Sequence, residues 1–97
     1  MGLTYNKLGT SDLNVSEICL GTMTFGEQTN NEEAFKIMDY SYESGINFFD
    51  TAEMYPIYPT KETQGLTEEI IGSWIKEKKK RDKIILATKI CSYNPKG

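Results

Sequence analysis

Histidine is absent from the 97-residue sequence, and cysteine occurs only twice, as Cys19 and Cys91. Zinc sites are built mainly from His and Cys side chains, so the sequence offers no usual ligand set and we expect no metal. Both cysteines fall in apolar, strand-like runs. If these runs are the first and third strands of a consecutive parallel sheet, the cysteines lie about 10 Å apart, beyond the reach of a disulfide. We therefore expect two reduced thiols in the core.

Long hydrophobic runs and an excess of positive charge are also missing. No apolar run approaches the roughly 20 residues that a membrane-spanning helix needs, and the polar start of the chain lacks the charged and apolar regions of a signal peptide. The net charge of −3 gives no basic surface for nucleic acid or an anionic membrane. We expect a cytoplasmic protein that binds neither nucleic acid nor membranes. Its oligomeric state does not follow from the sequence.

The sequence does contain an alternation of strand-like and helix-like segments, which is typical of a parallel α/β fold. Its length and 38% hydrophobic content suit one small domain or part of one. Residues 3–7 and 12–16 flank the turn sequence Gly9-Thr10-Ser11 and predict a β-hairpin ahead of the main fold. The segments expected after it are a buried strand over 18–20, a helix ending at Gly45, a strand over 46–49, a helix after the loop 51–65, and a strand over 83–90.

Two segments show the periodicity of helices that bury one face. Asn30 or Asn31 can cap the first helix. Thr67 is expected to cap the second, with Leu66 and Ile71 as a hydrophobic staple around it. The residues expected on the buried faces are Ala34, Ile37, Met38 and Ser41 or Tyr42 in the first helix, and Ile70, Ile71, Trp74 and Ile75 in the second.

Polar or flexible residues stand at the ends of the three predicted parallel strands. Gly21 and Thr22 follow the first strand, Asp50 follows the second, and Lys89 stands at the far end of the third. The carboxyl ends of parallel strands meet at one edge, which in α/β folds faces the ligand site. We therefore expect these residues to line one rim, with Tyr55 on the long loop above it.

Asp50, Tyr55 and Lys89 have the residue types of an acid–base centre. An ammonium group near a phenol favours the phenolate, and a carboxylate can orient and balance that ammonium. The alternative is a purely structural role, in which Asp50 only accepts hydrogen bonds from backbone N–H groups in a turn while Tyr55 packs by its ring. Position along the chain does not decide between these two interpretations.

Four specific motifs extend over nearly the whole chain. They are Leu20-Gly21-Thr22-Met23-Thr24-Phe25-Gly26-Glu27-Gln28, Gly45-Ile46-Asn47, Ala52-Glu53-Met54-Tyr55-Pro56 and Glu62-Thr63-Gln64-Gly65-Leu66-Thr67-Glu68. Together they resemble the aldo-keto reductases, most closely the Tas-like NADP(H)-dependent branch. The resemblance implies the start of a (β/α)8 TIM barrel, an α/β fold, closed at its bottom by the hairpin.

The resemblance also implies a reaction and the residues that perform it. The expected reaction is NADPH-dependent reduction of a small-molecule carbonyl, an aldehyde or ketone, to an alcohol. Tyr55 would be the proton donor, with Asp50 and Lys89 as its catalytic partners. The positions that the resemblance places near the nicotinamide and its ribose are Gly21, Thr22, Met23 and Asp50.

The sequence departs from the family pattern in one large respect. The family has a further catalytic histidine after the fourth strand, and a full barrel takes about 250 residues. Residues 1–97 contain no histidine and reach about three strands. We therefore expect an incomplete N-terminal segment of a reductase domain that is inactive when isolated.

Two other interpretations remain open at the level of sequence. One is a truncated, non-enzymatic remnant that is stable only through association with a partner or a second copy. The other is a hydrolase that uses Asp50 and Glu53. The hydrolase is disfavoured because the two carboxylates lie in one short loop and the sequence has no histidine to bind a metal.

Overall fold

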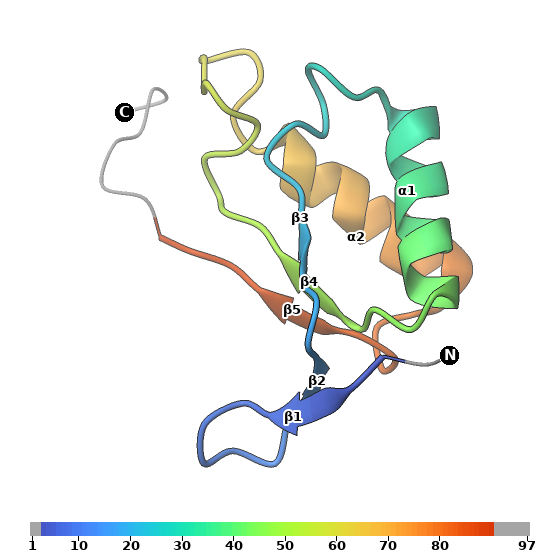
Figure 1. The fold of residues 1–97 in the computed structure, drawn as a ribbon. Helices are drawn as coiled ribbons and strands as arrows, with labels where there is room; N and C mark the ends of the chain where they lie inside the picture. The colour runs from blue at the N-terminus through green and yellow to red at the C-terminus, as the bar shows by residue number, and fades with distance from the viewer. Residues whose placement is uncertain (1–2, 91–97) are drawn as a thin grey trace.

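The computed structural model describes residues 3–90, which form a β-hairpin, a parallel sheet and two helices (Figure 1). The elements are β1 (Tyr5–Lys7), β2 (Asn14–Ser16), β3 (Leu20–Gly21), α1 (Asn31–Glu43), β4 (Phe48–Asp50), α2 (Leu66–Lys78) and β5 (Ile85–Ala87). The hairpin pairs β1 with β2, and the parallel sheet has the order β3-β4-β5. This order confirms the predicted alternation of strands and helices. Neither helix of this part of the chain combines the length and apolar character needed to cross a bilayer.

The hairpin is attached near the start of β4, at the bottom of Figure 1. Asn47, which immediately precedes β4, makes the connection. Its side-chain oxygen accepts a hydrogen bond from the Ser16 amide at 2.7 Å, and its side-chain nitrogen donates to the Asn14 carbonyl at 2.9 Å. The hydroxyl of Tyr5 donates to the Gly45 carbonyl. The predicted hairpin is thus confirmed, and it lies at the end of the sheet opposite the carboxyl ends of the strands.

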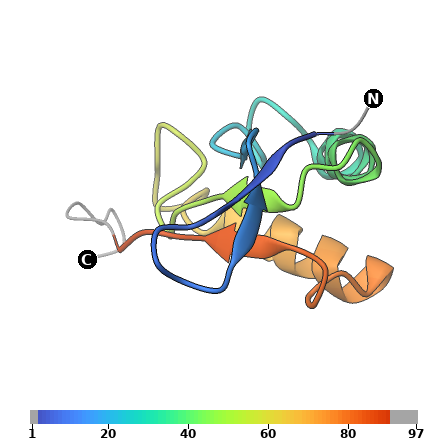
Figure 2. The same ribbon diagram turned by 60° about the horizontal axis from the view of Figure 1, so that its bottom comes forward.

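Both helices pack on one face of the parallel sheet, as Figures 1 and 2 show. Phe49 of β4 points into this layer and is fully buried. Trp74 of α2 is also fully buried, with its ring centroid 5.4 Å from that of Phe49. Its indole N–H donates to the Asp39 carboxylate of α1 at 2.9 Å, so the Trp74 side chain connects α2 to both α1 and β4. The core consists of Phe25, Ala34, Met38, Phe49, Ile70, Ile71, Trp74 and Ile84.

The ends of α1 follow from its sequence. Asn30 is the N-cap and accepts a hydrogen bond from the Glu33 amide at 2.9 Å. Gly45 follows the helix with a φ of 104°, a conformation that glycine adopts without strain. The prediction that Ile37 is buried is wrong, because Ile37 lies at the margin of a narrow buried stripe and is 39% exposed. The residues of α1 that are buried are Ala34, Met38 and Ser41.

The start of α2 differs from the prediction. The helix begins at Leu66 after Gly65, and no side chain caps it. Thr67 lies inside the first turn, where it is fully buried and its hydroxyl donates to the Phe25 carbonyl. The predicted cap at Thr67 and the staple of Leu66 and Ile71 are therefore wrong, because a tertiary contact takes the hydroxyl. The buried residues of the predicted apolar face are Ile70, Ile71 and Trp74, and the partly buried one is Ile75.

The first parallel strand is shorter and more exposed than predicted. Only Leu20 and Gly21 belong to β3, Ile18 is 49% exposed, and Cys19 is exposed. The predictions of a buried strand over 18–20 and of a core thiol at Cys19 are therefore wrong. The physical reason is that the helices cover one face of the sheet, while residues 3–90 provide no second layer over the other face. Cys91 lies outside the described residues.

Candidate active site

The three parallel strands end at one edge of the sheet, with β4 in the middle. Their register pairs Gly21 with Asp50 and Asp50 with Ala87. The backbone amide of Thr51 continues this pairing by donating to the Ala87 carbonyl at 2.8 Å. Lys89 stands two residues after the end of β5. The register therefore gathers Gly21, Asp50 and Lys89 at the edge where the sequence predicts them.

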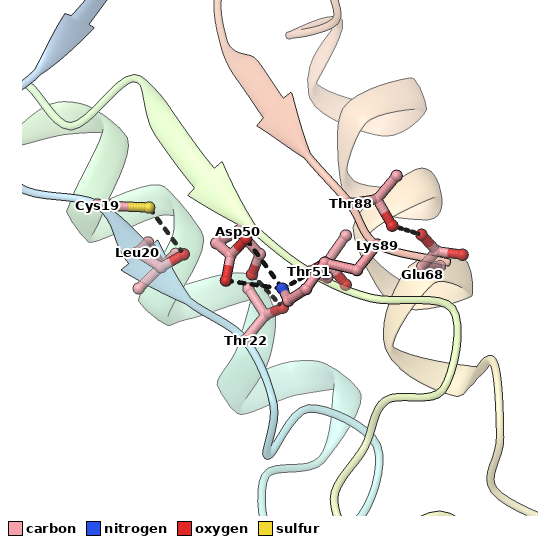
Figure 3. A network of polar contacts seen from close by, with 8 residues as sticks. All are labelled: Cys19, Leu20, Thr22, Asp50, Thr51, Glu68, Thr88 and Lys89. Atoms are coloured by element: carbon pink, nitrogen blue, oxygen red, sulfur yellow. Dashed lines mark hydrogen bonds and ion pairs between the residues drawn. The ribbon is translucent and has the colours of Figure 1, made fainter. Parts of the chain in front are cut away.

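The ammonium group of Lys89 is held by oxygen atoms at this edge (Figure 3). It donates to both carboxylate oxygens of Asp50, each at 3.0 Å, and to the backbone carbonyl of Thr51 at 2.7 Å. Although desolvation disfavours the charged form, hydrogen bonds with Asp50 and Tyr55 raise the pKa of Lys89 above its ordinary value of 10.5. Lys89 is therefore a cation throughout the neutral range.

Tyr55 also lies beside this ammonium group, with the Nζ atom 5.0 Å from the centroid of the phenol ring. The tyrosine belongs to the loop 51–65, which has no helix or strand. Backbone hydrogen bonds nevertheless fix the loop. The Gly65 amide donates to the Tyr55 carbonyl at 3.0 Å, and the Ile57 amide donates to the Met23 carbonyl at 2.8 Å. The start of α2 and the loop after β3 thus hold Tyr55 next to Lys89.

A cavity of about 350 Å³ opens beside these residues. Thr22 is buried in its wall, and its hydroxyl donates to the backbone carbonyl of Asp50 at 2.9 Å. A Cβ atom added to Gly21 would meet no other atom within 4 Å, so the backbone there is open to a ligand. The cavity is lined by Gly21, Thr22, Met23, Thr24, Asp50 and Tyr55. Of these, Thr24 was not singled out from the sequence, although it stands in the same motif as its neighbours.

This arrangement has the chemical means for proton transfer. Tyr55 and Asp50 both line the cavity, and the Lys89 cation lies next to both of them, so a molecule bound there could receive a proton from the phenol. The sequence alone could not separate this arrangement from a loop tyrosine that packs by its ring. In residues 3–90, no group of His, Cys, Asp and Glu side chains is arranged to hold a metal ion.

Comparison with known proteins identifies the family of this chain. The sequence profile of the Aldo/keto reductase family matches residues 17–97. The chain belongs to this family. It is 47% identical over 88 residues to Protein tas of Escherichia coli (strain K12), a match that covers 91% of this chain and 25% of the relative. It is also 47% identical over 94 residues to the uncharacterized oxidoreductase YrpG of Bacillus subtilis (strain 168), covering 96% and 27%.

A solved structure of the family has the same fold over these residues. Aldo-keto reductase AKR11C1 from Bacillus halodurans, in its holo form, superposes with a TM-score of 0.72 at 43% sequence identity, covering 89% of this chain and 25% of that chain. The chain thus spans about a quarter of the length of the relatives it matches. The predicted family and fold class are confirmed: the fold is the N-terminal part of a (β/α)8 barrel, with the hairpin ahead of β3.

The chemistry of the cavity lining is compatible with one end of a nicotinamide cofactor, the kind of cofactor expected for an aldo-keto reductase. Small-molecule sites usually enclose about 300–1,000 Å³, and this cavity lies at the lower end of that range. The open backbone at Gly21 allows close approach of a flat ring. The Asp50 carboxylate can accept a hydrogen bond from a ribose hydroxyl. The residues available to hold this end are Gly21, Thr22, Met23 and Asp50.

Proposed function

We propose that this chain is the N-terminal segment of an NADP(H)-dependent oxidoreductase domain that reduces an aldehyde or ketone to an alcohol, with Tyr55 as the proton donor. The observation that carries the proposal is the position of the Lys89 ammonium, which is paired with Asp50 and lies 5.0 Å from the Tyr55 ring beside the cavity. Membership of the aldo/keto reductase family supports the general class of reaction.

Each of the three catalytic residues has a distinct part in this proposal. The hydroxyl of Tyr55 gives its proton to the substrate carbonyl oxygen as negative charge develops there. Phenols are weak acids at neutral pH, so the cation of Lys89 is needed to stabilise the phenolate that remains. Asp50 accepts two hydrogen bonds from the lysine and so keeps the ammonium next to the phenol.

The cofactor and the substrate would share the cavity. When bound, NADPH supplies the hydride that the carbonyl carbon accepts. Gly21, Thr22, Met23 and Asp50 would hold its nicotinamide and ribose. The hydrogen bond from Thr22 to the Asp50 carbonyl links the wall of the cavity to the catalytic strand end, and it fixes the backbone of Asp50 before any ligand arrives.

Replacement of Tyr55 by phenylalanine tests the proposal. The assay uses a completed barrel, in which residues 1–97 are joined to the remainder of a related reductase. Tyr55→Phe removes only the hydroxyl, so kcat for a simple aldehyde should fall by about 10²- to 10⁴-fold, the usual contribution of general acid–base catalysis. The affinity for NADPH should barely change.

Tyr58→Phe is the matched control, because Tyr58 lies in the same loop and is 83% exposed. This variant should keep the turnover of the unmodified barrel. Near-unmodified turnover in Tyr55→Phe would overturn the role of Tyr55 as the proton donor. A completed barrel that folds but has neither turnover nor NADPH binding would favour the alternative of a non-enzymatic remnant.

A further inference from the structure

The short segment that carries Lys89 lies beyond the sheet. The last residue of β5 is Ala87, so Thr88 and Lys89 are outside the strand ladder. The backbone carbonyl of Lys89 accepts a hydrogen bond from the Glu53 amide at 3.3 Å, longer than usual for such a bond. The Lys89 side chain is held by its own hydrogen bonds to Asp50 and Thr51, and further contacts of this segment can add to them.

One such contact is a short hydrogen bond between Thr88 and Glu68. The Thr88 hydroxyl donates to the Glu68 carboxylate at 2.6 Å, a length typical of charge-assisted O–H···O bonds. Neighbouring side chains of an extended chain point to opposite sides. Figure 3 shows Thr88 pointing to Glu68 while Lys89 points to Asp50. A side chain that anchors Thr88 on one side thus directs Lys89 to the other.

Glu68 is itself firmly placed, in the first turn of α2. The residue before it, Thr67, is fully buried and its hydroxyl donates to the Phe25 carbonyl, which fixes this turn. Gly65, which immediately precedes the helix, donates to the backbone carbonyl of Tyr55. The same end of α2 therefore contacts the segment of Tyr55 and the segment of Lys89, and it can set the spacing between them.

We propose that Glu68 is a positioning residue which, through the hydroxyl of Thr88, holds Lys89 between Asp50 and Tyr55. This inference rests on the proposed function of the site. It gives a role to a residue that does not line the cavity and that touches none of the proposed reacting groups. The carboxylate acts on the reaction only by fixing the backbone and side-chain direction next to it.

Thr88→Val is the sharpest test, because it removes the hydroxyl without changing the net charge. In the completed barrel, kcat should fall by about 10- to 100-fold, as expected for a misplaced catalytic group, while KM for NADPH changes little. The pH profile of the residual activity should move upward, as it would if the cation near the phenol were lost. Thr88→Ser retains the hydroxyl and should retain the activity and the pH profile.

Glu68→Ala should reproduce the effect of Thr88→Val, and the double variant should cost no more than either single change, because both remove the same bond. Glu69→Ala is the matched control for charge and helix position. Glu69 is exposed in the same first turn, and the described residues offer its side chain no hydrogen bond or ion pair. This control should leave kcat and the pH profile unchanged.

A titration of the Lys89 side chain by NMR separates this inference from the proposed function, because it needs no turnover. The pKa of Lys89, which is raised by its hydrogen-bond partners, should fall in Thr88→Val and stay raised in Thr88→Ser. If Tyr55→Phe is fully active while this shift is observed, the proposed function fails and the positioning role stands. An unchanged pKa together with an unchanged kcat in Thr88→Val would overturn the positioning role.

Discussion

The two sides of β4 use opposite chemistry, although the residues involved are neighbours in the sequence. Phe49 is fully buried and packs against Trp74 within the helix layer. Asp50 faces away from that layer, is 39% exposed and holds the cation of Lys89. Since successive side chains of a strand point to opposite faces, one short segment serves both the core and the candidate active site. The difference teaches that stability and reactivity can be altered separately here.

The energetic terms on the two sides differ in kind. Burial of an apolar side chain on the helix side contributes about 1.5–3 kcal/mol to stability. A partly exposed ion pair, such as the one between Asp50 and Lys89, contributes at most about 1 kcal/mol. The ion pair therefore matters less for folding than for holding a charge beside Tyr55. Substitutions on the two sides should separate these effects.

The largest expected effect on stability comes from Phe49→Ala in the completed barrel. Removing a buried aromatic ring should lower the free energy of unfolding by about 3–5 kcal/mol, measured by urea denaturation, while kcat of the folded fraction stays near the unmodified value. Tyr40→Ala is the control, because Tyr40 is 75% exposed on α1 and should change stability by no more than about 0.5 kcal/mol. A loss of kcat without a loss of stability in Phe49→Ala would break the comparison.

Lys89→Met should lower activity while leaving stability nearly unchanged. Loss of the cation should lower kcat by at least about 10²-fold, or roughly 3 kcal/mol, while the free energy of unfolding changes by less than about 1 kcal/mol. The raised pKa of Lys89 means that the ammonium is present at all pH values below about 10.5 and is lost only above that value. Without this cation the phenolate is less stable, so steady-state kinetics between neutral and alkaline pH should show the optimum of the residual activity moved upward. A variant that unfolds instead would assign Lys89 to stability.

The smallest expected effect on stability comes from Thr51→Val. Thr51 directly follows Asp50, so this variant tests the stability of the chain next to the candidate active site. Thr51 is fully buried, and its hydroxyl has no hydrogen-bond partner among residues 3–90. Replacing this hydroxyl by a methyl group should raise the free energy of unfolding by about 1 kcal/mol, because an unpaired polar group is removed from the core.

Thr67→Val is the contrasting variant for this measurement. Its buried hydroxyl is bonded to the Phe25 carbonyl, so the same substitution should destabilise the protein by about 1–2 kcal/mol. Thermal melts of the two variants in parallel give the sign of each effect. Destabilisation by Thr51→Val would mean that its hydroxyl has a partner in the completed protein.

Features set by local signals were predictable from the sequence. The cap at Asn30 and the glycine at Gly45 bound α1 as expected, because both act through the backbone next to them. The apolar run before Asp50 predicted the strand and placed the carboxylate at its end, although only Phe49 of this strand is fully buried. The meeting of Asp50 and Lys89 followed from the parallel order of strands, which the alternation of helices and strands indicates.

Features that depend on contacts between distant segments were not predictable. Thr67 resembles a helix cap, but its hydroxyl is taken by a carbonyl from a loop far earlier in the chain. The exposure of Cys19 depends on what covers the second face of the sheet, and periodicity within one strand does not contain that information. The hydrogen bond between Glu68 and Thr88 joins residues 20 positions apart, so the sequence around neither residue predicts it.

The fluorescence of the buried Trp74 side chain can be used to follow the packing of the core. Trp74 is the only tryptophan in residues 1–97 and is enclosed between α2 and β4, with its N–H bonded to Asp39. Its fluorescence spectrum therefore reports the polarity around the helix layer. Formation of the core should shift the emission to shorter wavelength, and separation of α1 from α2 should shift it to longer wavelength. The indole lies in the core and not in the cavity wall, so a ligand bound beside Asp50 should leave the emission maximum in place.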